Sequence, residues 1–446
     1  MGSARSDNFW VGHLLRRAGF GATPAEMKYY CSLGYDGTLD LLLNPDKVNN
    51  DELEQAIKQQ DFDFTNIDDL KRWWLYRMAF TARPLEEKMT LFWHGHFATS
   101  NRKVNNAYGM YGQNLLFRKY ALGNFHELLY NVSKDPAMIV WLDNQQNRKG
   151  KPNENYAREI MELFSLGIGN YSEQDIKQAA RAFTGWQTLP TGFFFNKNQH
   201  DDGEKTVLGV TGNLNGDDVV DILVRQPAAS KFISRKLCKF YVADDPDETL
   251  VNRIADVYMK SNYSIKQMME AIFTDNAFLS DKAFHAKIKS PAELVIGTIK
   301  TLQIKKLDAD LPATMARMGQ DLFMPPNVKG WDGGKAWIAT DTMMERFNFA
   351  NRITTEKFAE MRKYYPKPSD LMQKQGLTSA GQAVDYFAQM LVDGDLPAST
   401  RQKLIAYVSS DIKGEPVNEV PDEDTLEAKL RGLVHLIMTL PTYQLA

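Results

Sequence analysis

The chain has 446 residues, of which 43% are hydrophobic and 24% charged, ordinary values for a globular protein that buries a large core. Its formal net charge of −3 argues against a nucleic-acid-binding surface over the whole protein, because neutralising phosphates requires concentrated Lys and Arg. We therefore expect no nucleic-acid partner. No apolar run reaches the roughly 18 residues that a transmembrane helix needs, so we expect no transmembrane segment either.

Cysteine usage and the N-terminus leave the compartment open. Cys31 and Cys238 lie in apolar, helix-like stretches, which predicts buried thiols rather than a disulfide scaffold. Residues 1–10 lack the apolar core of a signal peptide. The sequence is compatible with a soluble protein of the cytoplasm and with an exported one.

Helix signals dominate the N-terminal part of the chain. Thr23 is a predicted N-cap, followed by Pro24 at the first helical position and Glu26 three residues after the cap. Gly34 is a predicted end for this helix, and Asp36 caps the next. Further helices are predicted over 68–81, 84–95, 104–122, 125–133, 136–144, 153–166 and 172–183.

Two stretches depart from the helical pattern. Within 186–212, residues 193–195 and 206–209 are predicted to form two short strands around a polar turn centred near Asp202-Gly203. Residues 324–338 are too aromatic for a linker and too rich in Gly and Pro for a helix.

The pattern as a whole predicts an all-α protein, a multi-helix, bundle-like globular fold with one short β-hairpin excursion around 190–210. No internal repeat and no low-complexity tract is present. We expect a single helical domain over 1–446, which could divide near 210–215 into N-terminal and C-terminal helical halves. Helices resume at 216–225, 228–241, 247–260, 264–274 and 289–303, and again over 340–446.

Seven short motifs follow one another along the chain: residues 13–21 (HLLRRAGFG), 91–97 (LFWHGHF), 152–164 (PNENYAREIMELF), 183–186 (FTGW), 200–206 (HDDGEKT), 289–291 (KSP) and 330–331 (GW). Together and in this order they resemble the large bacterial family catalogued as domain of unknown function 1800. The resemblance implies a helical fold and no settled activity. Many members of that family look exported, and their genes often lie beside genes for proteins that resemble sulfatases, so it also implies a sulfatase-like partner.

His94 and His96 have the spacing of a metal-binding pair if the chain is extended between them. On a continuous helix they would lie about 200° apart and could not converge. Gly95 is a candidate helix end that would free His96 to turn back. The alternative is one capping histidine and one packed against Trp93 and Phe97.

The helix predicted over 153–166 carries a polar stripe. Glu159 and Glu162, three residues apart, could ligate a hard cation or divide acid and base roles. The alternative is an ordinary amphipathic helix in which Arg158 reaches Glu154 or Glu162. The stripe consists of Asn155, Arg158, Glu159 and Glu162.

His200 and Asp201 lie on the predicted hairpin turn, where loops commonly carry function. They could supply metal ligands, or a base and the carboxylate that orients it. Asp202 and Gly203 are better explained as turn residues. A solvated polar turn is the alternative.

The leading functional hypothesis is a metal-assisted hydrolase with a His/Glu/Asp pocket. His94, His96 and His200 would hold a divalent metal ion, and Glu159 or Glu162 would be the general base. Arg158 and Asp201 complete the predicted catalytic set.

Two alternatives belong to other classes. One is a non-catalytic binding or assembly protein that works with the sulfatase-like partner at the cell surface, in which Arg158, Glu159 and His200 form a buried polar network. The other is a carbohydrate-binding module that stacks sugars on Trp331 and Trp337, although core packing also explains these side chains. The chain has no zincin, phosphate-loop, dinucleotide-binding or nucleophile-elbow motif.

Overall fold

The computed structural model describes residues 5–355, 367–411, 414–415 and 422–446. The chain packs as two compact units. Unit 1 draws on residues 1–35, 284–320 and 333–446, and unit 2 on residues 36–283 and 321–332. Residues 210–215, where we considered a division of the single expected domain possible, lie inside unit 2.

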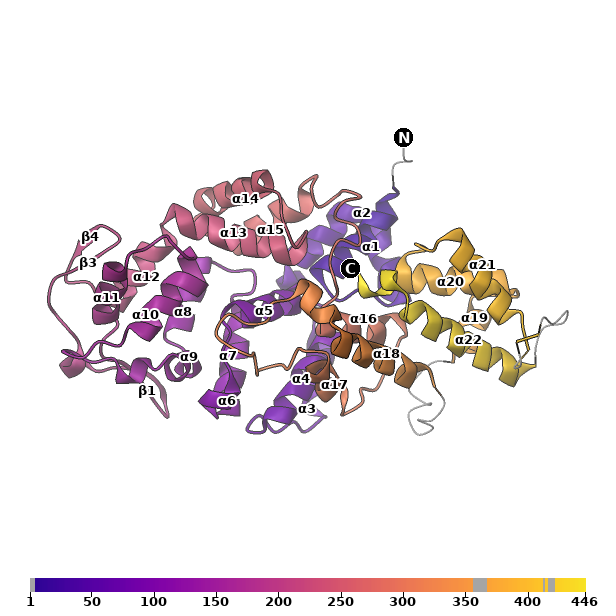
Figure 1. The fold of residues 1–446 in the computed structure, drawn as a ribbon, viewed down its shortest axis with the longest axis horizontal. Helices are drawn as coiled ribbons and strands as arrows, with labels where there is room; N and C mark the ends of the chain where they lie inside the picture. Colours follow the sequence, from indigo (N-terminus) through magenta and orange to yellow (C-terminus); the bar gives the residue numbers. More distant parts are fainter. Residues whose placement is uncertain (1–4, 356–366, 412–413, 416–421) are drawn as a thin grey trace. The chain divides into compact units, whose positions relative to one another are not determined.

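Unit 2 is helical apart from two small hairpins, as the all-α prediction requires (Figure 1). Side-chain caps begin many of its helices, and Ser172 and Asn215 each form a reciprocal capping box with an aspartate three residues later. Its helices are α3 (Asp51–Lys58), α4 (Ile67–Phe80), α5 (Pro84–His96), α6 (Asn101–Val104), α7 (Ala107–Lys119), α8 (Phe125–Ser133), α9 (Pro136–Trp141), α10 (Glu154–Met161), the π-helical turn Glu162–Leu166, α11 (Glu173–Ala182), α12 (Gly216–Val224), α13 (Pro227–Tyr241), α14 (Glu248–Lys260) and α15 (Ile265–Thr274).

The strands form near the residues where we predicted them, but their pairing differs from the prediction. The predicted strands do not pair with each other: β1 (Trp186–Leu189) pairs with β2 (Gly192–Phe195), and β3 (Lys205–Val207) pairs with β4 (Val210–Gly212). The second hairpin turns through Leu208 and Gly209, both with positive φ (49° and 81°). This is the backbone of a two-residue hairpin turn. Leu rarely occupies a position with positive φ, so these residues give little indication of a turn in the sequence.

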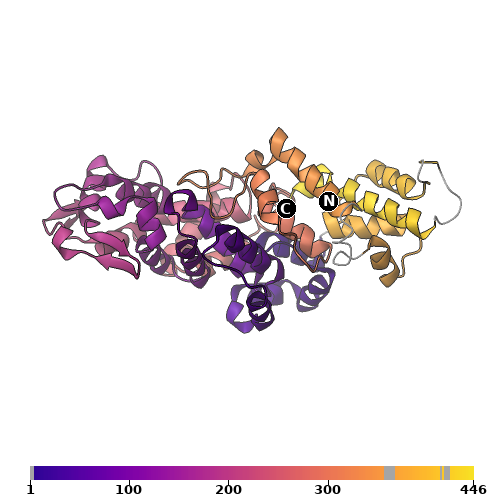
Figure 2. The same cartoon turned by 90° about the horizontal axis from the view of Figure 1, so that it is seen from below.

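Unit 1 is built from segments far apart in sequence. In Figures 1 and 2 its yellow C-terminal helices lie side by side. The predicted break at Gly34 is confirmed, since Gly34 has a φ of 69° and interrupts α2 where unit 1 ends. Its elements are α1 (Asp7–Ala18), the first part of α2 (Pro24–Leu43), α16 (Pro291–Thr301), α17 (Leu311–Arg317), the turn Gly334–Ile338, α18 (Thr340–Thr354), α19 (Pro368–Lys374), α20 (Ala380–Val392), α21 (Ala398–Val408), α22 (Glu423–Met438) and the turn Pro441–Gln444.

Both cysteines are free thiols; Cys238 is buried and Cys31 is partly exposed. Among the described residues, no helix combines the length and the apolar character that crossing a membrane requires.

The core of unit 2 contains a fully buried carboxylate. Glu87, with an exposed fraction of 0%, lies on α5 and accepts hydrogen bonds from α4 and α7. The donors are Trp74 Nε1 (3.1 Å), Arg77 Nε (3.2 Å), Arg118 Nε (2.6 Å) and Arg118 Nη2 (3.0 Å). Burial acts to raise the pKa of Glu87, but Arg118 and Arg77 outweigh it and hold this pKa below its ordinary value.

Glu87 therefore fixes three helices at once. Arg77 also donates to Glu54 of α3 at 3.0 and 2.7 Å, which adds a fourth helix to the network. Removing one member of such a buried pair costs far more stability than the intact pair contributes, because the remaining charge stays buried without a counter-charge.

We predict that Glu87→Gln lowers the free energy of unfolding of unit 2 by about 3 kcal/mol, because the buried Arg118 loses its pairing with Glu87 and Arg77 keeps only its pairing with Glu54. Urea denaturation followed by tryptophan fluorescence measures this. The stabilisation from the Glu87 charge is present above pH 4.5, its ordinary pKa, and is lost as the pH falls through the lower folded-state pKa.

The matched control is Glu248→Gln, which removes an exposed partner of Arg235 and should leave the unfolding curve nearly unchanged. Equal curves for Glu87→Gln and Glu248→Gln would contradict the role of Glu87.

Candidate functional site

His94 lies in the last turn of α5, where its ring holds an irregular segment in place. Its Nε2 accepts a hydrogen bond from the backbone N–H of Phe323 at 3.1 Å. The ring packs between Trp74, Phe323 and Trp331 at centroid distances of 5.1, 5.3 and 5.5 Å. Burial lowers the pKa of His94 to about 3, so the imidazole is neutral at physiological pH.

Gly330 completes this attachment. Its φ is 82°, and a Cβ built there would lie 2.4 Å from the carbonyl oxygen of Gly95. Only glycine fits so close a contact between the two backbones. The motifs at 91–97 and 330–331 thus form one packing unit that fastens residues 321–332 to α5.

His96 occupies a separate aromatic pocket. It remains in the helix, which continues through Gly95, so the expected helix end between the histidines is wrong. Its Nε2 lies 3.0 Å from the carbonyl oxygen of Phe164, so Nε2–H is the donor. Burial and the nearby Lys236 ammonium lower its pKa well below the ordinary range.

His200 is buried in a third part of unit 2, apart from His94 and His96. Its Nδ1 donates to the carbonyl oxygen of Thr184 at 2.9 Å. Asp201 beside it accepts two bonds from Arg181, at 2.7 and 3.1 Å, and these hold its pKa at about 2. Both side chains fasten the 200–204 loop to α11.

The carboxylates of the 153–166 segment lie at the end of α10 and in the π-helical turn. Glu159 is half-buried, and burial together with the negative charge of Glu162 raises its pKa. Glu162 accepts a short hydrogen bond from Tyr171 Oη. Arg158 forms the helical pair with Glu154 that the sequence suggested, and a closer two-bond pair with Glu173 at 2.9 and 2.8 Å.

The predicted metal centre is not assembled. Nε2 of His94, Nε2 of His96 and Nδ1 of His200 are each bound to a different backbone group. Within the described ranges, no group of three or more His, Cys, Asp or Glu side chains could share a metal ion. The residues predicted to hold a divalent metal do not fit one, because their rings lie in separate structural contacts and do not converge.

The two tryptophans of the carbohydrate hypothesis are also committed to packing. Trp331 packs against His94 in unit 2, with the two rings tilted and their centroids 5.5 Å apart. Trp337 belongs to unit 1, is 7% exposed and covers Gly319. The buried Trp337 ring provides no open platform for a sugar.

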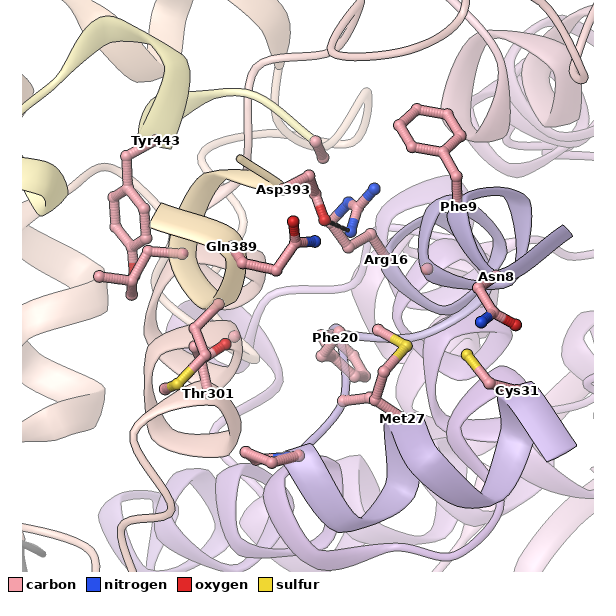
Figure 3. Close-up of a pocket in the computed structure, with 18 of the residues that line it drawn as sticks. Asn8, Phe9, Arg16, Phe20, Met27, Cys31, Thr301, Gln389, Asp393 and Tyr443 are labelled. Atoms are coloured by element: carbon pink, nitrogen blue, oxygen red, sulfur yellow. Dashed lines mark hydrogen bonds and ion pairs between the residues drawn. The ribbon is translucent and has the colours of Figure 1, made fainter. Parts of the chain in front are cut away.

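Unit 1 contains a cavity of about 660 Å³ (Figure 3). One wall comes from α1 and α2, with Phe9, Phe20 and Met27. Met390 and Leu391 at the end of α20 form another apolar part. The volume falls in the range of pockets that enclose a small organic molecule.

Charged groups line the rest of the cavity. Arg16 Nη1 bonds to Asp393 Oδ1 at 2.5 Å, the contact drawn as a dashed line in Figure 3. Asp393 adopts a left-handed backbone (φ 56°) as the C-cap of α20, and its other oxygen lies 3.3 Å from Nε2 of His285. Burial acts to raise the pKa of Asp393, but Arg16 and His285 outweigh it and hold this pKa below its ordinary value.

Lys289 is another cation on the wall. Its Nζ donates to the carbonyl oxygen of Tyr443 at 2.8 Å and lies 4.3 Å from the centroid of the Tyr443 ring. Burial lowers the pKa of Lys289 to about 7. The cavity therefore combines apolar walls with a few convergent polar groups, which is the usual composition of a binding site.

The model of the family described as "Protein of unknown function (DUF1800)" matches residues 13–445. The chain belongs to this family. No curated protein and no solved structure gives a significant match.

The family motifs divide between the two units. Residues of the first motif, Arg16, Phe20 and Gly21, line the cavity, as does Lys289 of the 289–291 motif. The histidine motifs instead fix loops within unit 2. Sequence reasoning missed the cavity, although both of these motifs were visible, because their convergence depends on segments about 270 positions apart.

We predict that His94→Gln preserves the fold while removing an acid-sensitive element. Because the folded-state pKa is depressed, unfolding takes up a proton below pH 6.5, and the contribution of neutral His94 to stability falls as pH drops from 6.5 towards 3. The variant should lose less unfolding free energy over this window than the parent chain. Urea titrations at stepped pH values measure the difference.

His126→Gln is the matched control, since His126 is partly exposed and pairs with Asp221. If the free energy of unfolding depends on pH equally in His94→Gln and in the parent chain, the conclusion that His94 is a buried neutral imidazole is contradicted.

Proposed function

We propose that this chain is a binding protein for a small amphipathic molecule, which it encloses in the cavity of unit 1. The observation that carries the proposal is the cavity itself, about 660 Å³ in volume, with aromatic, thioether and charged side chains on its walls. Such pockets bury most of a small ligand and use a few polar groups to orient it.

The wall chemistry supports a ligand with an apolar body and a polar end. Phe9, Phe20 and Met27 offer dispersion contacts to an aliphatic or aromatic skeleton. Arg16 is already paired with Asp393, so it presents a nearly neutral ion pair, while Lys289 Nζ contacts the carbonyl oxygen and the ring of Tyr443. A polar end that accepts hydrogen bonds matches this arrangement.

Of the hypotheses drawn from the sequence, this proposal is nearest to the non-catalytic binding protein. A bacterial source and a sulfatase-like partner at the cell surface are further proposals, and both rest on the family resemblance alone.

A second candidate function is acid–base catalysis by Glu159 and Glu162. The supporting observation is the raised pKa of Glu159, caused by burial and by the neighbouring carboxylate, at a π-helical turn. Two carboxyls whose environments differ can divide proton donor and acceptor roles, and π-helical turns are frequent at functional sites. A hydrolase of this kind would need no metal ligands from the histidines.

We predict that the purified chain binds anilinonaphthalene sulfonate, an amphipathic anion, saturably and at one site, with a rise in dye fluorescence. Met390→Trp should abolish this binding because the larger side chain fills the cavity. Fluorescence titration measures the affinity, and near-ultraviolet circular dichroism shows that the variant is folded.

Met344→Trp makes the same exchange at a side chain that is 60% exposed, and it should leave dye binding unchanged. Loss of binding in both variants or in neither would overturn the cavity as the binding site.

For the second candidate, a panel of p-nitrophenyl esters, phosphates and sulfates should contain a substrate whose hydrolysis falls at least about tenfold in Glu159→Gln, the scale of a general acid–base contribution. Glu154→Gln, on the same helix and in contact with Arg158, is the matched control and should retain the rate. A panel without any substrate, or equal rates in the two variants, would reject this function.

A further inference from the structure

Lys289 differs from an ordinary surface lysine in its surroundings. It directly precedes Ser290, the N-cap of α16, and it lines the unit 1 cavity. Its Nζ is held by the carbonyl oxygen of Tyr443 and lies over the Tyr443 ring, so the amine has a fixed position. A fixed primary amine on a cavity wall is within reach of a molecule inside that cavity.

Burial favours the neutral form of Lys289. Burial is the largest cause of the lowered pKa, about 7, and the positive charges of Arg16 and Arg346 add to it. Arg346 is 2% exposed and donates through Nη2 to the backbone carbonyl oxygen of Lys289 at 2.7 Å. A lysine that is desolvated and close to another cation is the type that attacks carbonyl groups.

The two carboxylates that act on Lys289 are held by other donors. Asp393 bonds to Arg16 and lies beside His285. Glu293 accepts the backbone N–H of Ser290 at 2.7 Å in the capping box of α16. Both oppose the lowering of the pKa without cancelling it.

We propose that the unit 1 cavity takes a small aldehyde or ketone with an apolar body, and that Lys289 Nζ holds its carbonyl carbon as an imine. This inference rests on the proposed binding function and names the ligand class. The lone pair of Nζ forms the C–N bond, and the carbonyl oxygen takes up the two amine protons and leaves as water. The products are the imine and one water molecule, and no oxidant or reductant is needed.

The walls favour particular members of this class. Phe9, Phe20 and Met27 suit an aromatic or branched aliphatic skeleton. Thr301 and Gln389, also on the wall, offer hydrogen bonds to a hydroxyl or ether oxygen on the same molecule.

Reductive trapping tests the proposal with benzaldehyde as the probe. The whole chain is incubated with benzaldehyde and cyanoborohydride, and the modified lysines are identified by peptide mass spectrometry. Near pH 7, Lys289 should react at least about tenfold faster than lysines with an ordinary pKa of about 10.4, because these are almost fully protonated there. Its rate should level off above its pKa of about 7, whereas the rates of ordinary lysines continue to rise.

Lys28 is the internal reference, since it lines the same cavity. Lys28→Arg should leave labelling of Lys289 intact, and Lys289→Arg should remove the fast phase. Near-ultraviolet circular dichroism shows that the Lys289→Arg variant is folded.

The outcomes separate the two proposals. Dye binding that is sensitive to Met390→Trp, together with labelling of Lys289 no faster than Lys28, would overturn the imine and leave the binding function standing. Absence of cavity-dependent dye binding would overturn the binding function and the imine with it.

Discussion

The buried carboxylate of Glu87 is the interaction on which unit 2 depends. Three side chains from α4 and α7 donate to it, and it has no exposure to water. A charge in that position is stable only when its counter-charges are fixed in the same place. The packing of α3, α4, α5 and α7 is therefore specified together rather than pair by pair.

The same network continues towards the histidine motif. Trp74, which donates to Glu87, also packs against His94, and His94 holds the backbone N–H of Phe323. The contact between Gly95 and Gly330 closes the arrangement. Residues that looked like metal ligands in the sequence are thus explained by the need to attach residues 321–332, which are distant in sequence, to α5.

Polar motifs in this family member serve two different purposes. In unit 2, pairs such as Arg181 and Asp201 satisfy one another and fasten loops. In unit 1, Arg16, Asp393 and Lys289 lie on the wall of a cavity large enough for an organic ligand. An amine on the wall of a cavity can meet a ligand, whereas the buried imidazoles of unit 2 are each bonded to a different backbone group.

The sequence by itself determined the helical class, most helix positions and the break at Gly34, because caps, prolines and apolar periodicity act within a few residues. It also located both irregular stretches, but not the pairing of the hairpin strands, which depended on an unusual Leu208 turn. It named Glu159, Glu162, His94, His96 and His200 as chemically important without showing that the three histidines serve separate contacts. Only the tertiary structure decided which of these groups meet, and only it revealed the cavity. That cavity is formed by α1, α2, α16, α20 and Tyr443, whose proximity no local pattern encodes.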